Sequence, residues 1–134
     1  MTNDLVTLKD TCSVADARRI MGEEHIRHLP IINEAGDLVG VLSQKDVLAA
    51  MVSVLADMDQ NAIDTMEAAI PIRELMTTAM TTIQEDSRLR DAGLTLLELK
   101  LGCLPVLSNG RLVGILTETD FIKLAVYLLD QVDS

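Results

Sequence analysis

The chain is poor in aromatic and basic residues. Of its 134 residues only Phe121 and Tyr127 are aromatic, so a core must be built from aliphatic and methionine side chains. Its 11 lysines and arginines are outnumbered by 21 aspartates and glutamates, which gives a net charge of −10. Nucleic-acid binders need clustered positive charge, so this balance argues against a nucleic-acid partner.

Paired cysteines, a leader and long apolar runs are also missing. Cys12 and Cys103 form no CxxC motif and have no metal-ligand spacing, which indicates two reduced thiols and leaves a disulfide between them open. The N-terminus lacks the basic and apolar regions of a signal peptide. The longest helix-like apolar stretch, residues 47–56, is far shorter than the roughly 20 residues of a membrane span. We expect a soluble, cytoplasmic protein with no membrane partner.

Patterns for metal binding and catalysis are incomplete. The motif Asp57-x-Asp59-x-Asn61 resembles the beginning of a calcium loop, but Ala62 and Ala68 stand where that loop needs glycine and glutamate. The two histidines have no cysteine or carboxylate partners in metal-site spacing. There is no Ser-His-Asp or Cys-His set and no phosphate loop. We therefore expect no metal site, no catalytic residues and no enzymatic activity.

What the chain does contain is an internal repeat. Residues 36–46 (GDLVGVLSQKD) return as residues 110–120 (GRLVGILTETD), and the preceding LPII of residues 29–32 is matched by LPVL at 104–107. A repeat of this kind predicts two copies of one structural unit.

The repeat extends back to the N-terminus. At an offset of 75 residues Met1-Thr2 falls on Met76-Thr77, and the offset becomes 74 after Glu34 because the first turn is one residue longer. Since the first copy already begins at Met1, we expect little sequence to be missing before it.

Each copy has the pattern β-α-β-β-α and is too small to bury its own apolar face. We predict an α+β fold in which two such repeats pack sheet to sheet and share one core. The first repeat is expected to cover residues 1–56 and the second residues 71–134, with residues 57–70 as a helical connector between them. Pro71 is expected to be the first residue of a short helix that ends at Met76. In the first repeat the expected elements are strand 5–8, a helix capped by Ser13 and Asp16, hairpin 29–32 with 38–42, and a helix that begins around 43–46 and runs through Leu55. In the second repeat they are strand 81–83, helix 88–101, hairpin 104–107 with 112–116, and helix 120–129.

Helices 88–101 and 120–129 are apolar on nearly all sides. Such a helix must be buried on more than one side, either deep inside one chain or at a subunit interface. A chain of this size has little interior, so we favour a homodimer formed through these two helices.

Two strand-to-helix junctions carry the same short motif. Ser43-x-x-Asp46 and Thr117-x-x-Asp120 both have the spacing of a capping box, which stabilises a helix start by about 1 kcal/mol. The same junction can also bind a nucleotide, because free N–H groups at a helix start suit a phosphate and a carboxylate accepts hydrogen bonds from ribose hydroxyls. Spacing alone favours the cap.

The combination of both motifs changes that balance. Two copies of Leu-Pro-apolar-apolar, a turn and Gly-x-Leu-Val-Gly-x-Leu-[Ser/Thr]-x-x-Asp resemble tandem cystathionine-β-synthase-type (CBS) domains, a Bateman module, over all of the chain except 57–70. The resemblance implies that the two repeats are related by pseudo-twofold symmetry and form two clefts. These often bind adenosine-containing ligands such as AMP, ADP, ATP or S-adenosylmethionine, and family members form a dimer through helices. By position the resemblance implies that Asp46 and Asp120 hold ribose, that Ser43 and Thr117 approach phosphate, and that Thr7, Thr82, Leu29-Pro30 and Leu104-Pro105 flank the base.

The two implied clefts differ in charge. Arg27, His28 and Lys45 lie near the first motif, whereas Gly102, Cys103 and Thr119 occupy the matching places near the second. A charged nucleotide is therefore expected at the first, although His28 can also be a plain surface histidine. The net charge of −10 favours adenosine or AMP over ATP.

Our leading hypothesis is a regulatory module that senses adenine nucleotides and acts in trans on a protein partner. The alternative is a scaffolding or dimerisation module without a ligand, in which the junction motifs serve only as helix caps.

Overall fold

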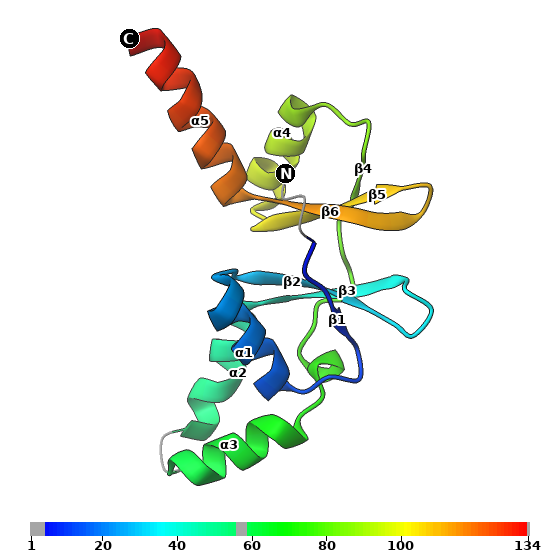
Figure 1. Ribbon diagram of the computed structural model, residues 1–134, viewed down its shortest axis with the longest axis vertical. Helices are drawn as coiled ribbons and strands as arrows, with labels where there is room; N and C mark the ends of the chain where they lie inside the picture. Colours follow the sequence, from blue (N-terminus) through cyan, green and yellow to red (C-terminus); the bar gives the residue numbers. More distant parts are fainter. Residues whose placement is uncertain (1–4, 56–58, 134) are drawn as a thin grey trace. The chain divides into compact units, whose positions relative to one another are not determined.

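A computed structural model describes residues 5–55 and 59–133. Asp57 and the Met1-Thr2 match lie outside these residues. The chain divides into two compact units (Figure 1): one comprises residues 6–80, and the other comprises Leu5 together with residues 81–133.

The first unit is built on a three-stranded sheet of order β1-β2-β3, in which β1 is parallel to β2 and β2 is antiparallel to β3. Helices α1 and α2 lie together on one side of this sheet (Figure 1). The core between them is aliphatic, with Leu29, Ile31, Leu42 and Val47 among its fully buried side chains. The elements are β1 (Leu8–Lys9), α1 (Val14–Glu24), β2 (His28–Ile32), β3 (Leu38–Ser43), α2 (Gln44–Leu55), α3 (Gln60–Ala69) and the 3-10 helix η1 (Ile72–Glu74).

The second unit repeats this plan with a sheet of order β4-β5-β6 and a smaller core around Leu96, Leu104, Val106 and Leu116. Its elements are β4 (Ile83–Gln84), α4 (Leu89–Leu99), β5 (Cys103–Ser108), β6 (Arg111–Thr117) and α5 (Glu118–Asp133). The predicted α+β fold with β-α-β-β-α in each repeat is confirmed, and the packing of the two sheets against each other stays a prediction. Among the described helices none combines the length and apolarity that crossing a membrane requires.

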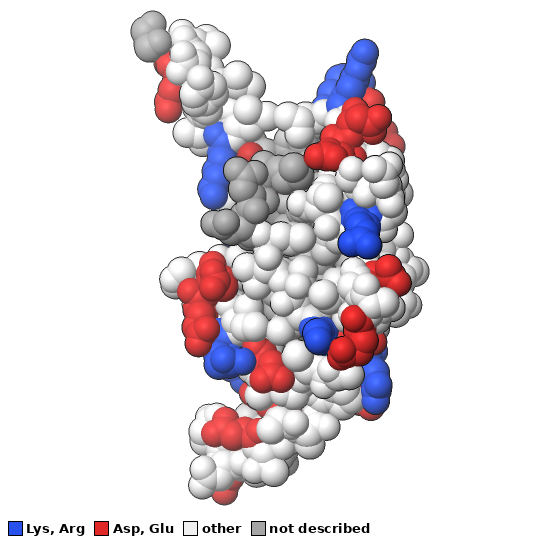
Figure 2. All heavy atoms as spheres, turned by 45° about the vertical axis from the view of Figure 1, so that its right-hand side comes forward, with Lys and Arg blue, Asp and Glu red and all other residues white. Residues whose placement is uncertain are grey.

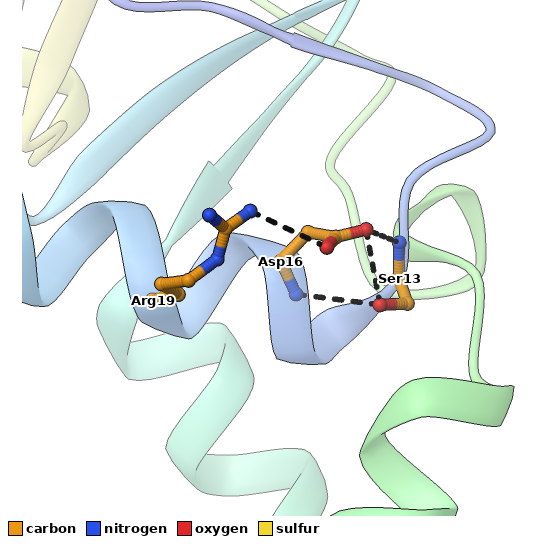
Figure 3. A network of polar contacts seen from close by, with 3 residues as sticks. All are labelled: Ser13, Asp16 and Arg19. Carbon is orange, nitrogen blue, oxygen red and sulfur yellow. Dashed lines mark hydrogen bonds and ion pairs between the residues drawn. The ribbon is translucent and has the colours of Figure 1, made fainter.

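The start of α1 shows the capping box that the sequence predicts (Figure 3). The Asp16 N–H donates to Ser13 Oγ at 3.3 Å, and the Ser13 N–H donates to Asp16 Oδ2 at 3.0 Å. The pKa of Asp16 is lowered from its ordinary value of 3.8, first by the hydrogen bond from the Ser13 backbone and further by the nearby Arg19. Each partner thus satisfies a backbone donor at the helix start.

Of the segment that resembles a calcium loop, Asp59 and Asn61 lie at the start of helix α3. Asp59 is its N-cap and accepts a hydrogen bond from the Ala62 N–H at 2.8 Å. The helix packs against α1, where the buried carboxylate of Glu67 forms an ion pair with Arg18. A buried carboxylate needs a charged partner, so this pair fixes where α3 lies on α1.

Helix α5 has no buried side chain along its length from Glu118 to Asp133. Ile122, Leu129 and Val132 are 62%, 57% and 78% exposed, and α5 extends away from the other elements of its unit (Figure 1). In α4, Ala92 and Leu96 face the core, whereas Leu89, Leu94, Leu97 and Leu99 are exposed. Deep burial within one chain is therefore the wrong interpretation of α5. It is also longer than the predicted 120–129.

Candidate functional site

The first hairpin brings several predicted site residues to one end of its sheet. Because β2 and β3 are antiparallel, the first residue of β2, His28, pairs with the last residue of β3, Ser43. The Gln44 N–H, the first of helix α2, donates to the Arg27 carbonyl oxygen at 2.8 Å. Arg27 and Gln44, 17 positions apart in sequence, thus meet where α2 begins.

Ser43 and Asp46 form a reciprocal capping box at this junction. The Asp46 N–H donates to Ser43 Oγ at 3.1 Å, and the Ser43 N–H donates to Asp46 Oδ2 at 3.3 Å. An ionised carboxylate has about four acceptor positions, so this hydrogen bond leaves capacity for ribose hydroxyls. The cap and the ligand site are therefore compatible on the same aspartate.

The second unit has the same arrangement. Cys103 pairs with Thr117 across β5 and β6, and the Glu118 N–H donates to the Gly102 carbonyl oxygen at 3.2 Å. The Thr117 N–H donates to Asp120 Oδ2 at 2.8 Å, and the Asp120 N–H donates to Thr117 Oγ1 at 3.4 Å. The two junctions are equivalent in backbone and cap geometry.

The sequence did not reveal that the carbonyl groups just before β2 and β5 accept hydrogen bonds from the helix starts. The Arg27 and Gly102 oxygens take the first N–H of α2 and α5, and the hydroxyls of Ser43 and Thr117 take the third. Fewer helix-start donors are then left for a phosphate than the motif alone indicates. The sequence does contain a signal for this contact, because a helix that directly follows the second strand of a hairpin begins beside the start of the first strand.

The side chains around the two junctions differ strongly in charge. At the first, Arg27 and Lys45 are exposed and His28 is half-buried; at the second, Cys103 is half-buried and Thr119 is exposed. With two helix-start donors engaged at each junction, a phosphate gains from side-chain cations, and among the matched positions these occur at the first junction.

The remaining predicted residues lie along the neighbouring strands. Thr7 precedes Leu8, which pairs with Ile31, and Thr82 precedes Ile83, which pairs with Val106. Both threonines are half-buried. Beside them, the side chains of the Leu29-Pro30 and Leu104-Pro105 segments are buried, and both leucines belong to the core of their own unit. These two leucines can offer a ligand their backbone groups only.

Two hollows lie within the second unit. The larger, about 330 Å³, is lined by Leu107, Ser108, Asn109 and a polar segment, residues 84–86, that includes two carboxylates. It lies at the turn of the β5–β6 hairpin, at the opposite end of these strands from the Cys103–Thr117 pair, and its acidic lining does not suit a phosphate. The smaller, about 120 Å³, lies beside Asp120 and is otherwise lined by Leu89, Leu116, Phe121 and Leu124. This apolar hollow fits a side chain better than a nucleotide.

Charged side chains of both signs are interspersed with uncharged surface on the face shown in Figure 2. No group of three or more histidine, cysteine or acidic residues that could hold a metal ion occurs among residues 5–55 and 59–133.

Burial raises the pKa of Cys103 to about 11. Only about one thiol in a thousand is then ionised at pH 8, and the thiolate is the reactive form. We expect a Cys12→Ser variant, whose remaining thiol is Cys103, to react with iodoacetamide at pH 8 at least about 100-fold more slowly when folded than in denaturant. Mass spectrometry over time measures this, and equal rates in both states would contradict it.

Comparison with known proteins identifies the family. The CBS domain profile matches residues 1–53 and 72–127, and the chain therefore belongs to the CBS domain family. The predicted resemblance is confirmed: the chain is a pair of CBS domains.

Solved structures share the fold over nearly the whole chain. AcuB from Vibrio cholerae is 34% identical with a TM-score of 0.81, covering 100% of this chain and 93% of that one. CBSX2, solved in complex with AMP, is 32% identical with a TM-score of 0.75 and coverages of 93% and 90%. The CBS domain pair of MJ0100, solved with 5′-methylthioadenosine and S-adenosyl-L-methionine, is 27% identical with a TM-score of 0.75 and coverages of 92% and 90%. Relatives of this chain thus bind adenosine-containing ligands.

The chain is shorter than its curated relatives. It spans 40% of the length of a Methanocaldococcus jannaschii protein and 61% of CBSX1 from Arabidopsis thaliana, at 31% and 32% identity.

Proposed function

We propose that this chain is a cytoplasmic regulatory module that binds an adenosine-containing ligand and acts in trans on a protein partner. One observation supports the proposal: His28 pairs with Ser43 and the Arg27 carbonyl accepts the first N–H of α2, so that Arg27, His28 and Lys45 belong to the same junction as Asp46, whose carboxylate retains acceptor capacity. A carboxylate for ribose and cations for phosphate are the two groups that a nucleoside monophosphate requires. Relatives solved with AMP and with S-adenosyl-L-methionine support the same class of ligand.

The first junction is the proposed site for a phosphorylated ligand, with Asp46 on the ribose and Lys45 and Arg27 near the phosphate. Asp120 at the second junction lacks comparable cations among its matched positions, which suits an uncharged adenosine moiety better. Thr7 and Thr82, which lie beside the Leu-Pro segments, are proposed to flank the bases. The net charge of −10 makes AMP a better ligand than ATP.

The module is proposed to act by population shift. A ligand can shift an equilibrium between two arrangements only by its difference in affinity for them, and the protein partner would then recognise the favoured arrangement. No catalytic step is assigned to any residue.

Calorimetric titration of AMP, ADP, ATP and S-adenosylmethionine into the purified chain tests the ligand class. We expect saturable binding with submillimolar Kd, tighter for AMP than for ATP. Absence of both heat and thermal stabilisation with all four compounds would contradict the proposal.

One observation favours a second function, that of a dimerisation scaffold: the unburied apolar surface of α5. Exposed apolar surface of this extent marks an interaction site. We propose that α4 and α5 form a homodimer interface. In the scaffolding alternative, this interface is the whole function and the junction motifs only cap helices.

A further inference from the structure

Helix α3 has a charged residue in the face that packs on the first unit. Its half-buried and buried side chains are Ala62, Ile63, Met66 and Glu67, and their spacing is that of one helix face. Ile63 and Met66 pack against the aliphatic core, but within the described helix, Gln60–Ala69, Glu67 is the one buried side chain, with 5% exposed. An apolar residue is usual at such a position, since glutamate is rarely buried unless it is paired.

The partner of this carboxylate is Arg18 on α1, whose Nη1 donates to Glu67 Oε1. The Arg18 side chain is 48% exposed, so salt ions reach this partner of the pair. A buried ion pair adds little stability compared with apolar side chains of the same size, but removing one partner leaves an uncompensated charge. The docking of α3 on α1 therefore depends on both charges.

A backbone hydrogen bond holds the end of α3 on the same helix. The Val14 N–H donates to the carbonyl oxygen of Ile70, the C-cap of α3, at 2.9 Å. Val14 and Arg18 are four residues apart and so lie on one face of α1. Helix α3 is thus attached to that face at two points, one of which is the ion pair.

The chain that follows α3 is held by contacts of its own. Ile72 is fully buried in the core of the unit, and its N–H donates to the Cys12 carbonyl oxygen at 2.9 Å. Further on, Thr77 pairs with Val41 at the edge of β3, with N–H to oxygen hydrogen bonds of 3.0 and 2.8 Å in the two directions. Loss of the α3 contacts therefore leaves the chain from Ile72 onward in place.

Helix α3 also lies outside the repeated plan of the fold. The CBS domain profile matches residues 1–53 and 72–127, and Gln60–Ala69 falls between these two matches. The second unit has no corresponding helix among its described residues. The pair of Glu67 with Arg18 is therefore a feature of this chain that the repeat does not require.

We propose that α3 is a charge-dependent strap. Residues 60–71 open from α1 as one unit when the Glu67–Arg18 pair is broken or screened by salt, while the rest of the first unit stays folded. Opening exposes Ile63 and Met66 and frees the Val14 N–H at the start of α1. A segment with few buried apolar side chains opens at a lower free energy than the whole unit, as a strap requires. This inference does not depend on the proposed ligand site.

Amide hydrogen exchange of an Arg18→Gln variant tests the strap. Glutamine has nearly the helix propensity of arginine, so α1 itself should persist. The Ile70 amide, which donates to the Met66 carbonyl oxygen, and the Val14 amide should both exchange at least about tenfold faster than in the wild-type chain. The Ile72 and Val41 amides should change less than about twofold.

An Arg19→Gln variant is the matched control. Arg19 is the next residue of α1 and forms an exposed ion pair with Asp16 at 3.6 Å, away from α3. It should leave the exchange of the Ile70 amide unchanged. Unchanged Ile70 exchange in Arg18→Gln, or an equal increase at Ile70, Ile72 and Val41, would overturn the strap, since the pair would then hold either nothing or the whole unit. Failure of Arg18→Gln to fold would overturn it for the second reason.

Salt dependence tests the role of charge. Raising the ionic strength from about 0.01 M to about 1 M shortens the Debye length from roughly 30 Å to 3 Å and should speed exchange of the wild-type Ile70 amide about two- to fivefold. An Arg18→Met, Glu67→Met double variant should keep α3 docked, because apolar side chains of similar size replace a buried pair without loss of stability. Its Ile70 exchange should not respond to salt. The same salt response in both chains would contradict a charge-dependent strap.

Discussion

An Asp46→Asn variant should bind AMP roughly 10- to 100-fold more weakly than the wild-type chain, because hydrogen bonds to a charged carboxylate contribute about 1.5–3 kcal/mol each. The amide retains an oxygen that can accept from the Ser43 N–H, so the capping box at the start of α2 should persist. The expected result is therefore a loss of binding without a loss of folding. Calorimetry measures the affinity, and thermal unfolding measures the fold.

Asp16→Asn is the matched control for this prediction. Asp16 accepts from the Ser13 backbone in a capping box of the same kind, but it begins α1 instead of a helix that follows a hairpin. It should change the melting temperature by a similar amount and leave AMP affinity unchanged. Asp120→Asn completes the series, since it should affect AMP binding less than Asp46→Asn if the cations of the first junction determine the site. Equal AMP affinity of the wild-type chain and Asp46→Asn would contradict the assignment.

Placing charges on α5 should separate the chains. Ile122, Val126 and Leu129 follow helical spacing and are 62%, 53% and 57% exposed. Burying an aliphatic side chain of this size stabilises an interface by about 1.5–3 kcal/mol, and a symmetric dimer contains each position twice. We expect an Ile122→Lys, Leu129→Lys double variant to dissociate at least about 100-fold more readily than the wild-type dimer.

Light scattering at several protein concentrations measures this effect. The wild-type chain should have twice the 14.6 kDa mass of one chain, and the double variant should have the mass of one. The melting temperature of a dimer also reflects the free energy of dimerisation. The stability of the folded chain in the wild type and the double variant should therefore be compared at protein concentrations below the dissociation constant of the dimer. Val113→Lys, at an exposed apolar residue on β6, is the control and should remain dimeric. A monomeric wild-type chain would contradict the proposed interface.

The parts of the fold that sequence could predict are those with a local cause. The Asn109-Gly110 turn is the strongest hairpin signal in the chain, and both residues have positive φ, 52° and 80°, as a tight turn requires. The capping box of Ser13 and Asp16 likewise follows from spacing within one helical turn. Because the two copies match in sequence, each element predicted for the first copy could also be predicted for the second.

The parts that sequence could not predict depend on contacts between distant segments. The ion pair of Glu67 with Arg18, which fixes α3 on α1, joins residues 49 positions apart. The Val41–Thr77 pairing likewise depends on which edge of the sheet the connecting chain reaches after η1. The junction motif predicted the aspartates and hydroxyls of the two capping boxes. It could not reveal that the Arg27 and Gly102 carbonyls already occupy the first helix donors.

These occupied donors also explain why the two interpretations of the junction motif coexist. The hydroxyl and one carboxylate oxygen stabilise the helix start, so the motif would persist even without a ligand. Only the side chains of Arg27, His28 and Lys45 distinguish the first junction from a plain cap. Under the proposed function, binding of a phosphate therefore depends on residues other than the repeated hydroxyl residue and aspartate.

The most direct test of the central claim is an AMP titration followed by the amide chemical shifts of the isotopically labelled chain. The proposed site predicts saturable shifts at Arg27, His28, Ser43, Lys45 and Asp46, with smaller changes at the matched positions of the second junction. Shifts confined to the hollow around residues 84–86, or no saturable shift at all, would contradict the claim that the first junction binds an adenosine-containing ligand.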